Sequence, residues 1–342
     1  MTKSFKVAVV GATGVVGQEM LKVLEQRRFP VRELVPVASE RSAGKKVRFN
    51  GRDHTVLAIA PEVFEGVDMA LFSAGGSTSK HWSPIAASKG AIVIDNSSAF
   101  RRDPDVPLCV PECNLEAAKV RPKGIIANPN CSTIQMVVAL KPLHDEAGIE
   151  RVVVSTYQAI SGGGAKAIAA FDAQCKAAAA GEPVDETPLS GRLTGNVLMH
   201  WTPDAESGYQ EEELKMVFET RKILGDPSIR VSPTAVRVPV VSGHSESITV
   251  ETRKPLTAAR ARELLEAAPG VVVVDDFSHG VYPKPIDAVG EDAVYVGRIR
   301  DDVGNPGGVQ LWVVSDNLRK GAALNAVQIA EGVLIGPEAF KR

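Results

Sequence analysis

The sequence predicts an α/β protein of two domains: a parallel β-sheet with helices on both faces, followed by an α+β domain with a mixed sheet. The chain has 342 residues, more than one simple core usually organises. In its N-terminal third, near-continuous apolar strands alternate with helices, a pattern typical of a parallel sheet covered on both sides. After residue 131 the strands become longer, which indicates a mixed or antiparallel sheet.

The first domain opens with a β-branched run at 5–11 that ends in glycine. A helix follows at 16–27, where apolar residues recur at helical spacing. The next strand, 33–39, contains Pro36, which is unfavourable within a sheet because proline has no N–H to donate. The remaining strands expected here are 67–75, 91–98 and 124–130.

The second domain is expected to begin with a helix at 132–148. An alanine-rich helix follows at 165–182, and the polar stretch 183–215 is expected to be irregular. A last apolar helix, 322–336, is expected to return to the first domain. The strands lie within 151–164, 234–254, 270–277, 292–302 and 307–321. The predicted domains are therefore 1–130 plus 320–342, and 131–319.

Charge and composition exclude several classes of protein. With 39 basic and 41 acidic residues the formal net charge is −2, without the basic excess of a nucleic-acid or membrane-surface protein. No apolar run approaches the roughly 20 residues that cross a membrane, and the start has no signal-peptide pattern. The four cysteines are too sparse for a disulfide framework, and Cys109 and Cys113 have no second pair with which to bind zinc. We therefore expect a cytoplasmic protein with no metal.

A glycine-rich loop, "GATGVVG" at 11–17, lies directly between the first strand and the first helix. Gly11 permits a tight turn, Gly14 a close backbone approach, and Gly17 close packing of helix on strand. The helix N-terminus then offers backbone N–H groups to a pyrophosphate. The spacing differs from G-x-G-x-x-G, but the strand–loop–helix context predicts a Rossmann-type dinucleotide site.

The end of the second strand favours NADP over NAD. An NAD site usually carries an acidic residue here to hold the ribose 2′-hydroxyl. Arg41 and Ser42 suit a 2′-phosphate instead, although Glu40 would hold a ribose if it pointed inward.

Cys131 lies at the turn between a strand and a helix, in the stretch "NPNCST". The preceding Asn-Pro-Asn cannot continue a helix, so the thiol lies at a helix start, with Ser132 or Thr133 available to cap the first turn. A helix N-terminus favours the thiolate. We therefore interpret Cys131 as a nucleophile rather than a small buried residue.

His244 is the candidate general acid or base. It follows a Ser-Gly break in an apolar strand, which lets the backbone turn the imidazole into a cleft. The other histidines lie in polar or helical settings, and most are expected at the surface: His54, His81, His144, His200 and His279.

Six motifs together resemble the aspartate-β-semialdehyde dehydrogenase family. They are, in order, "GATGVVG", "DNSSAFR", "NPNCST", "QAISGGG", "EEELK" and "RVPVVSGHSES". The resemblance spans nearly the whole chain, and the cysteine and histidine motifs are quite specific. One departure is that Ala12 and Thr13 stand where some members carry an aromatic residue and an arginine, so the cofactor pocket and regulation differ between branches.

The resemblance implies a reaction through a covalent thioester. Cys131 matches the nucleophile, and His244 the general acid/base. L-aspartyl 4-phosphate would acylate the cysteine with loss of phosphate, and NADPH would then reduce the thioester to L-aspartate 4-semialdehyde. This product serves lysine, threonine, methionine and isoleucine biosynthesis. The steps need a thiolate, a proton shuttle and a bound hydride carrier.

The resemblance also assigns the groups around the substrate's carbon skeleton. Arg237 matches the arginine that binds the α-carboxylate, with a surface charge as the alternative, and Gln158 matches the glutamine beside the cysteine, with a buried structural amide as the alternative. Glu212 matches the partner of the substrate amine. Its neighbours Glu211 and Glu213 leave that choice open.

Two cations match the phosphate site of the family. They are Arg101 and Lys215, each of which is otherwise an ordinary solvated charge. Arg102 is adjacent and could exchange roles with Arg101.

The matching cofactor residues belong to the glycine loop, the end of the second strand and two later loops. Ser161 and Gly162 lie where the nicotinamide end should rest, and Asn317 matches a contact to its amide, with helix capping as the alternative. The full set is Gly11, Thr13, Gly14, Val15, Val16, Arg41, Ser42, Ser161, Gly162 and Asn317. The family also implies a homodimer with a site in each subunit.

Two other hypotheses stay open. N-acetyl-γ-glutamyl-phosphate reductase runs the same chemistry on an acetylated substrate, which needs no acidic partner for an amine, so Glu212 favours the aspartyl substrate. A non-catalytic paralogue would have lost the nucleophile or the base, yet Cys131 and His244 are both present.

Overall fold

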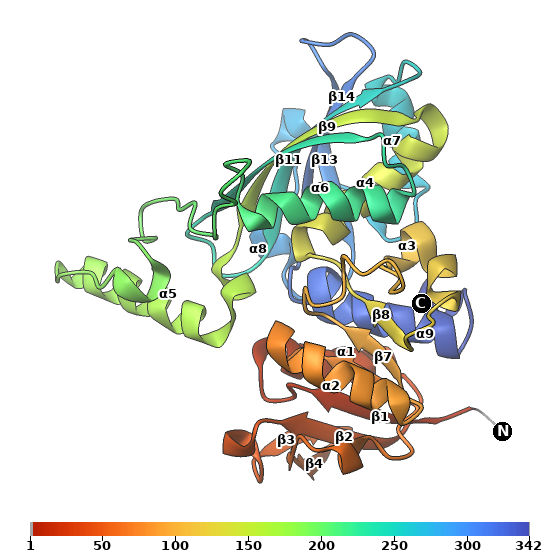
Figure 1. The fold of residues 1–342 in the computed structure, drawn as a ribbon. Coiled ribbons are helices and arrows are strands. Elements are labelled where there is room, and N and C mark those ends of the chain that lie inside the picture. The colour runs from red at the N-terminus through yellow and green to blue at the C-terminus, as the bar shows by residue number, and fades with distance from the viewer. Residues whose placement is uncertain (1–2, 342) are drawn as a thin grey trace. The chain divides into compact units, whose positions relative to one another are not determined.

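The computed structural model describes residues 3–341, which divide into two compact units (Figure 1). Of the described residues, the first unit comprises 3–130 with 322–341, and the second comprises Cys131–Gly321. Each unit has its own six-stranded sheet. The predicted fold class, a Rossmann-type parallel sheet plus an α+β domain with a mixed sheet, is confirmed.

The sheet of the first unit is parallel, in the order β5-β2-β1-β6-β7-β8. The strand order reverses direction at β1, between β2 and β6, and such a switch point is where parallel α/β sheets bind ligands. A short β3–β4 hairpin stands beside this sheet. The strands are β1 (Phe5–Val10), β2 (Val31–Ala38), β3 (Lys46–Phe49), β4 (Arg52–Thr55), β5 (Leu57–Ala58), β6 (Met69–Phe72), β7 (Ile92–Asp95) and β8 (Ile125–Ala127).

Helices cover both faces of this sheet, as its apolar strands predicted (Figure 1). On one face α1 and the C-terminal α9 pack together, and on the other α2 packs on β6, β7 and β8. A buried ion pair joins the C-terminal end of α1 to α9, with Arg27 Nη2 lying 2.8 Å from Glu331 Oε2. The helices are α1 (Val15–Gln26), α2 (Gly76–Ser88), α3 (Pro111–Asn114) and α9 (Leu324–Leu334).

Pro36 does lie inside strand β2, and the register explains why it is tolerated. Backbone groups alternate sides along a strand, and Val37 O accepts a hydrogen bond from Gly11 N on the β1 side. The nitrogen of Pro36 therefore faces the β5 side, where only Val37 and Ala38, at the very end of the strand, pair with β5. The missing N–H thus falls where β2 behaves as an edge.

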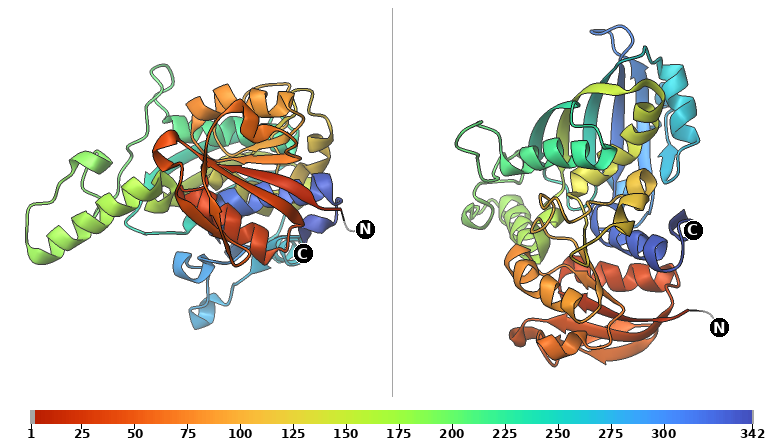
Figure 2. Two further views of the ribbon diagram at one scale, coloured as in Figure 1. Left: turned by 90° about the horizontal axis from the view of Figure 1, so that it is seen from below. Right: turned by 45° about the vertical axis from the view of Figure 1, so that its right-hand side comes forward.

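The second unit is built on a mixed sheet in the order β10-β9-β11-β14-β13-β12. Helices α4, α6 and α7 lie along one face of it, while α5 and the segment 181–210 extend away from the sheet (Figures 1 and 2). The strands are β9 (Ile149–Gln158), β10 (Arg230–Arg237), β11 (His244–Thr252), β12 (Val271–Val273), β13 (Val294–Asp301) and β14 (Val309–Ser315). The helices are α4 (Cys131–Ala147), α5 (Gly164–Ala180), α6 (Glu211–Leu224), α7 (Ala258–Glu266) and α8 (Pro285–Ala288).

One prediction about this unit is wrong: the stretch expected to be irregular, 183–215, ends in helix. Helix α6 starts at Glu211, and Gln210 caps it with Glu213 in a reciprocal capping box. The box satisfies backbone N–H groups that a helix start leaves unpaired. The three acidic residues that read as irregular sequence are in fact the first turn of this helix, where its dipole favours negative charge. Within residues 3–341, every helix is too short or too polar to span a bilayer.

A carboxyl group is buried between α4 and the mixed sheet. Glu246 is fully buried on β11, and neither of its side-chain oxygens has a hydrogen-bond partner with good geometry among the described residues. Burial raises the pKa of Glu246 well above its ordinary value, and the nearby Gln135 amide offsets only part of this effect. Burial and the charge of Arg237 hold the pKa of His244, on the same strand, well below its ordinary value. The raised pKa favours the neutral acid form of Glu246 in the folded protein.

We predict that Glu246→Gln stabilises the protein near neutral pH. The folded state holds this proton and the unfolded state releases it above a pKa of about 4.3, so the native protein loses about 1.4 kcal/mol of unfolding free energy per pH unit until the folded-state pKa is reached. The amide cannot ionise and avoids that loss. Denaturant unfolding at pH 5, 6, 7 and 8 should show the variant's advantage growing with pH.

Glu251→Gln is the matched control, because Glu251 lies on the same strand but pairs with Arg151 at 3.0 Å and is partly exposed. Its difference from the native protein should not grow with pH in this range. A flat difference for Glu246→Gln between pH 5 and pH 8 would show that the carboxyl is already ionised in the folded state.

Candidate active site

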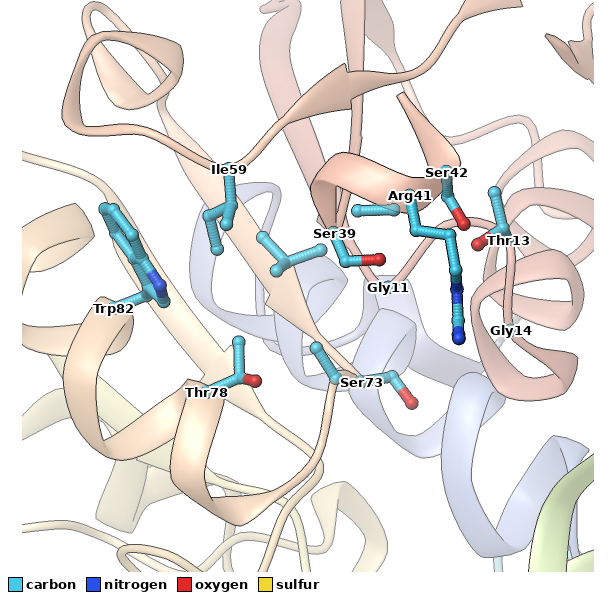
Figure 3. A pocket seen from close by; sticks show the side chains of 13 residues that line it. Gly11, Thr13, Gly14, Ser39, Arg41, Ser42, Ile59, Ser73, Thr78 and Trp82 are labelled. Atoms are coloured by element: carbon cyan, nitrogen blue, oxygen red, sulfur yellow. The ribbon is translucent and has the colours of Figure 1, made fainter. Parts of the chain in front are cut away.

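The glycine loop of the first unit borders a pocket of about 300 Å³ (Figure 3). Gly11 has φ of +90°, and a Cβ on it would lie 2.3 Å from Ser73 O, so only glycine fits this turn. A Cβ on Gly17 would lie 2.1 Å from Gly11 O, so the first turn of α1 packs directly on the loop. Helix α1 begins at Val15 and has no acidic residue in its first turn. The loop and the helix N-terminus therefore suit an anionic ligand.

Most of the predicted cofactor residues of the first unit line this pocket, and the others begin the adjacent helix. Gly11, Thr13 and Gly14 line it from the loop, and Arg41 and Ser42 line it from the turn after β2. Arg41 extends alongside the glycine loop in Figure 3. Val15 and Val16 are the first residues of α1. Glu40 is exposed and is not among the residues that line the pocket.

Strand register in the second unit brings three predicted site residues into one row. Arg237 on β10 pairs with Gln158 on β9. Ser245 on β11 pairs with Tyr157, which sets His244 beside Gln158. The three side chains are buried on the face of the sheet that carries α4. We call Gln158, Arg237 and His244 the polar row.

One ring nitrogen of His244 is hydrogen-bonded, and the other faces no hydrogen-bond partner among the described residues. Its Nδ1 accepts a hydrogen bond of 3.0 Å from the backbone N–H of Ala159, so the neutral ring carries its proton on Nε2. Nε2 has no partner among the described residues. The predicted backbone turn before it is present, since Gly243 has φ of +89° and a Cβ there would lie 2.9 Å from Pro285.

Cys131 is the first residue of α4, so its thiol lies at the helix N-terminus. The residue is half-buried. Ser132 and Thr133 follow it inside the first turn and therefore do not precede the helix as a cap would. A hydrogen bond links helix α4 to the sheet beside the polar row. Ser315 Oγ, on the strand paired with His244, donates it at 2.6 Å to Oε1 of Gln135, which lies one helical turn after Cys131 on α4.

Arg237 provides the positive charge of the site. Burial lowers the pKa of Arg237 from its ordinary value, while negative charge on Cys131 and Glu212 raises it again in part. The guanidinium Nη1 donates to Ala159 O at 2.5 Å. A Cβ on Gly162 would lie 3.5 Å from both Arg237 Nη1 and His244 Nε2, so this glycine keeps the space in front of them open.

The three consecutive glutamates of α6 have different environments. Glu212 is buried, and its Oε1 accepts a 3.3 Å hydrogen bond from Gln158 Nε2. Lys215 Nζ lies 3.1 Å from Glu212 Oε2. Glu211 has a side chain that is 61% exposed, and Glu213 is committed to the capping box and to Ala235 N. The geometry therefore connects Glu212 to the polar row.

Asn317 connects two loops beside His244. Its Oδ1 accepts a 2.9 Å hydrogen bond from Gly243 N, and its Nδ2 donates to Ser161 Oγ at 2.9 Å. The helix-capping alternative does not describe this residue, because it is Asp316 that accepts hydrogen bonds from Leu318 N and Arg319 N. Asn317, Ser161 and Gly162 are thus gathered next to the polar row.

Arg101 belongs to the first unit, where it is buried. Its guanidinium donates to the backbone oxygens of Asn96 and Ser97. Arg102, the alternative to it, is exposed. The burial of Arg101 indicates a placed guanidinium rather than a solvated charge.

Two residues at the site escaped sequence reasoning. His200 was expected at the surface with most histidines, yet its Nε2 accepts a 3.5 Å hydrogen bond from Arg237 Nε. The indole of Trp201 lies 4.7 Å from Arg237 Cζ. The adjacent aromatic pair in a polar stretch was the available signal, but the sequence does not say which arginine the pair meets.

Comparison with known proteins gives the family. Residues 6–121 match the family "Semialdehyde dehydrogenase, NAD binding domain", and residues 140–320 match "Semialdehyde dehydrogenase, dimerisation domain". The aspartate-semialdehyde dehydrogenase of Aquifex aeolicus is 58% identical over 330 residues, covering 96% of this chain and 97% of that protein. That of Bacillus subtilis is 50% identical over 341 residues, covering 97% and 98%.

Solved structures agree. Aspartate semialdehyde dehydrogenase II from Vibrio cholerae, complexed with ASA, superposes with a TM-score of 0.95 at 49% identity, covering 98% of this chain and 99% of that one. The Candida albicans enzyme with NADP superposes with a TM-score of 0.75 at 27% identity, covering 98% and 100%. This chain, with its NAD(P)-binding domain and its dimerisation domain, belongs to the aspartate-semialdehyde dehydrogenase family and is an enzyme of that activity.

Proposed function

We propose that this enzyme is NADP-dependent and makes L-aspartate 4-semialdehyde from L-aspartyl 4-phosphate through a thioester on Cys131. The observation that carries the proposal is the polar row, whose Arg237 interacts electrostatically with Cys131 at the start of α4. The proposed nucleophile and hydrogen-bond donor are the groups that acyl transfer uses, and the proposed carboxylate-binding cation would hold the substrate beside them.

The first step is attack of the Cys131 thiolate on the acyl phosphate. The helix N-terminus and the buried charge of Arg237 favour the thiolate over the thiol. A carbon–sulfur bond forms, negative charge develops on the former carbonyl oxygen, and collapse of this adduct breaks the carbon–oxygen bond to phosphate. His244 Nε2–H is the group that donates to the charged oxygen, since Nδ1 is already engaged by Ala159.

Reduction of the thioester follows, and bound NADPH supplies the hydride for it. His244 again donates to the oxygen that becomes negative. The adduct then expels the sulfur as thiolate, which releases the aldehyde and restores Cys131 for the next cycle. A histidine whose pKa is lowered stays neutral and keeps its Nε2 proton directed at the substrate.

The charged groups of the substrate have matching partners. Arg237 would bind the α-carboxylate, Glu212 the amine, and Lys215 with Arg101 the phosphate, while Gln158 would fix the substrate beside the thiol. Burial of Glu212 against Gln158 supports a substrate with a free amine. An acetylated amine carries no positive charge to pair with Glu212, so assays with N-acetyl-γ-glutamyl phosphate should show little turnover.

NADP is the proposed cofactor because a guanidinium and a hydroxyl line the pocket where the adenosine ribose would end, and Glu40 does not. Asn317, Ser161 and Gly162 are proposed for the nicotinamide end. The product would serve lysine, threonine, methionine and isoleucine biosynthesis. The cytoplasmic location stays a prediction.

A homodimer is proposed from the dimerisation-domain match and from the sheet face opposite α4. Tyr157 and Trp312 pack there with ring centroids 5.4 Å apart, and Tyr157 is 38% exposed. Exposed aromatic residues of this kind are typical of interfaces. Light scattering should give twice the chain mass, and a monomer mass at micromolar concentration would refute the dimer.

Mass mapping tests the thioester. Enzyme mixed with aspartate semialdehyde and NADP in the absence of phosphate should accumulate an acyl group, and an acid quench should find it on the peptide that contains Cys131. Cys131→Ala should lose this label and lower kcat at least about 1,000-fold. Cys175→Ala is the matched control, because Cys175 is also half-buried but lies on α5. A label on another cysteine, or activity retained without Cys131, would disprove the covalent mechanism.

Kinetics with both cofactors test the 2′-phosphate assignment. Arg41→Ala should raise KM for NADP by about 10- to 100-fold, the range expected for a charge-assisted hydrogen bond, and change KM for NAD little. Glu40→Gln, one residue away and outside the pocket lining, should leave KM for NADP within about 3-fold. Equal losses with NADP and NAD in Arg41→Ala would argue against a 2′-phosphate contact.

A further inference from the structure

The long segment between α5 and α6 returns to the sheet at Arg237. Leu198 and Arg237 form an isolated antiparallel bridge, with hydrogen bonds of 3.0 Å from Leu198 N to Arg237 O and 2.8 Å from Arg237 N to Leu198 O. This bridge fixes the segment against the end of β10. The residues that follow, His200 and Trp201, are thereby brought to the side chain of Arg237.

Both residues contact the guanidinium, and they do so from different directions. His200 Nε2 accepts from Arg237 Nε at 3.5 Å, and the ring of Trp201 lies 4.7 Å from Cζ. His200 Nδ1 lies 3.0 Å from the backbone oxygen of Leu189, an acceptor, so Nδ1 carries the proton and Nε2 is free to accept. The two rings also pack edge to face, with centroids 5.0 Å apart.

These contacts use a defined part of the guanidinium. Of its five N–H groups, Nε–H is directed to His200 and one Nη1–H to Ala159 O. The second Nη1–H and both Nη2–H groups have no partner in the part of the chain that the structure describes. One Nη1–H and one Nη2–H side by side form the fork that grips a carboxylate with two parallel hydrogen bonds. Arg237 Cζ lies over the indole ring of Trp201 at 4.7 Å, and this cation–π contact limits the rotation and the hydration of the guanidinium.

We propose that His200 and Trp201 are positioning residues that hold the guanidinium of Arg237 in the orientation in which it receives the substrate's α-carboxylate. The proposal rests on the proposed function, in which Arg237 is the carboxylate site. It gives the segment 181–210 a role in substrate recognition. Neither residue touches the reacting atoms, so both act through Arg237.

Steady-state kinetics separate this role from catalysis. Trp201→Leu removes the aromatic face and keeps an apolar side chain, and His200→Leu removes the acceptor. Each should raise KM for aspartate semialdehyde about 10-fold, with kcat within about 3-fold and KM for NADP unchanged. Trp201→Phe keeps a ring and should lie between native and Trp201→Leu. Met199→Ala is the control, because Met199 is on the same segment and 61% exposed.

A second measurement needs neither substrate nor cofactor. Iodoacetate carries a carboxylate, whereas iodoacetamide is neutral, and both alkylate a reactive thiolate. Arg237 beside Cys131 should make the native enzyme react faster with iodoacetate relative to iodoacetamide, and Arg237→Leu should lower that ratio. Trp201→Leu and His200→Leu should lower the ratio at least 3-fold while the iodoacetamide rate, which reports an intact helix start, stays unchanged.

The outcomes are distinguishable. A ratio that falls in Arg237→Leu but not in the His200 and Trp201 variants overturns the positioning role and leaves the proposed function intact. If Arg237→Leu does not change the ratio of the iodoacetate rate to the iodoacetamide rate, the positioning role is also overturned, because Arg237 would then not be the carboxylate site. Failure of the proposed function would appear instead in the native enzyme, as no turnover of aspartate semialdehyde. Equal losses in Met199→Ala would show a general effect of the segment and also overturn the proposal.

Discussion

The register of the mixed sheet is the constraint on which the site depends. Pairing of β10 with β9 and of β9 with β11 sets an arginine, a glutamine and a histidine side by side on the face that carries α4. A slip of one residue in β11 would turn His244 to the opposite face, because side chains alternate along a strand. The hydrogen bond from Ser315 to Gln135 then fixes the helix that bears Cys131 over the same row. Sheet geometry therefore determines where nucleophile, donor and cation can meet.

Burial affects the titratable side chains of this site differently: it leaves the charged form of one favoured and favours the neutral form of two others. Burial lowers the pKa of Arg237, and electrostatic interaction with Cys131 and Glu212 offsets part of that effect, which favours the charged guanidinium. His244 and Glu246 lie two residues apart on one strand, and burial keeps both neutral. One strand thus carries a neutral donor at the proposed substrate site and a neutral acid in the core. The electric field at that proposed site comes from Arg237, the helix N-terminus and the ion pair of Lys215 with Glu212.

Features set by local chemistry could be predicted from the sequence. The alternation of strands and helices, the glycine loop and the thiol at a helix start all follow from neighbouring residues, and the structure has each of them. The start of α6 also has a local signal, since Gln210 three positions before Glu213 indicates a capping box, but the Pro, Gly and Glu content of the stretch favours a loop instead. Which glutamate faces the site depends on the rotation of α6 on its neighbours, which no local pattern gives. The contact of His200 with Arg237 spans 37 positions and depends on the return of a whole segment.

The last element of the site is the space that missing side chains leave. A Cβ on Gly162 would stand 3.5 Å from the two nitrogens proposed to bind the substrate, in ordinary contact and so in the place of a ligand. A Cβ on Gly321 would stand 2.9 Å from Cys131 Cβ, closer than packed carbon atoms approach, so any side chain there would displace the nucleophile. Neither glycine is required by its backbone angle, since neither has a positive φ. These glycines therefore keep open the space around the thiol, the imidazole and the guanidinium. A substrate can reach the polar row because no side chain projects from the backbone at these two positions.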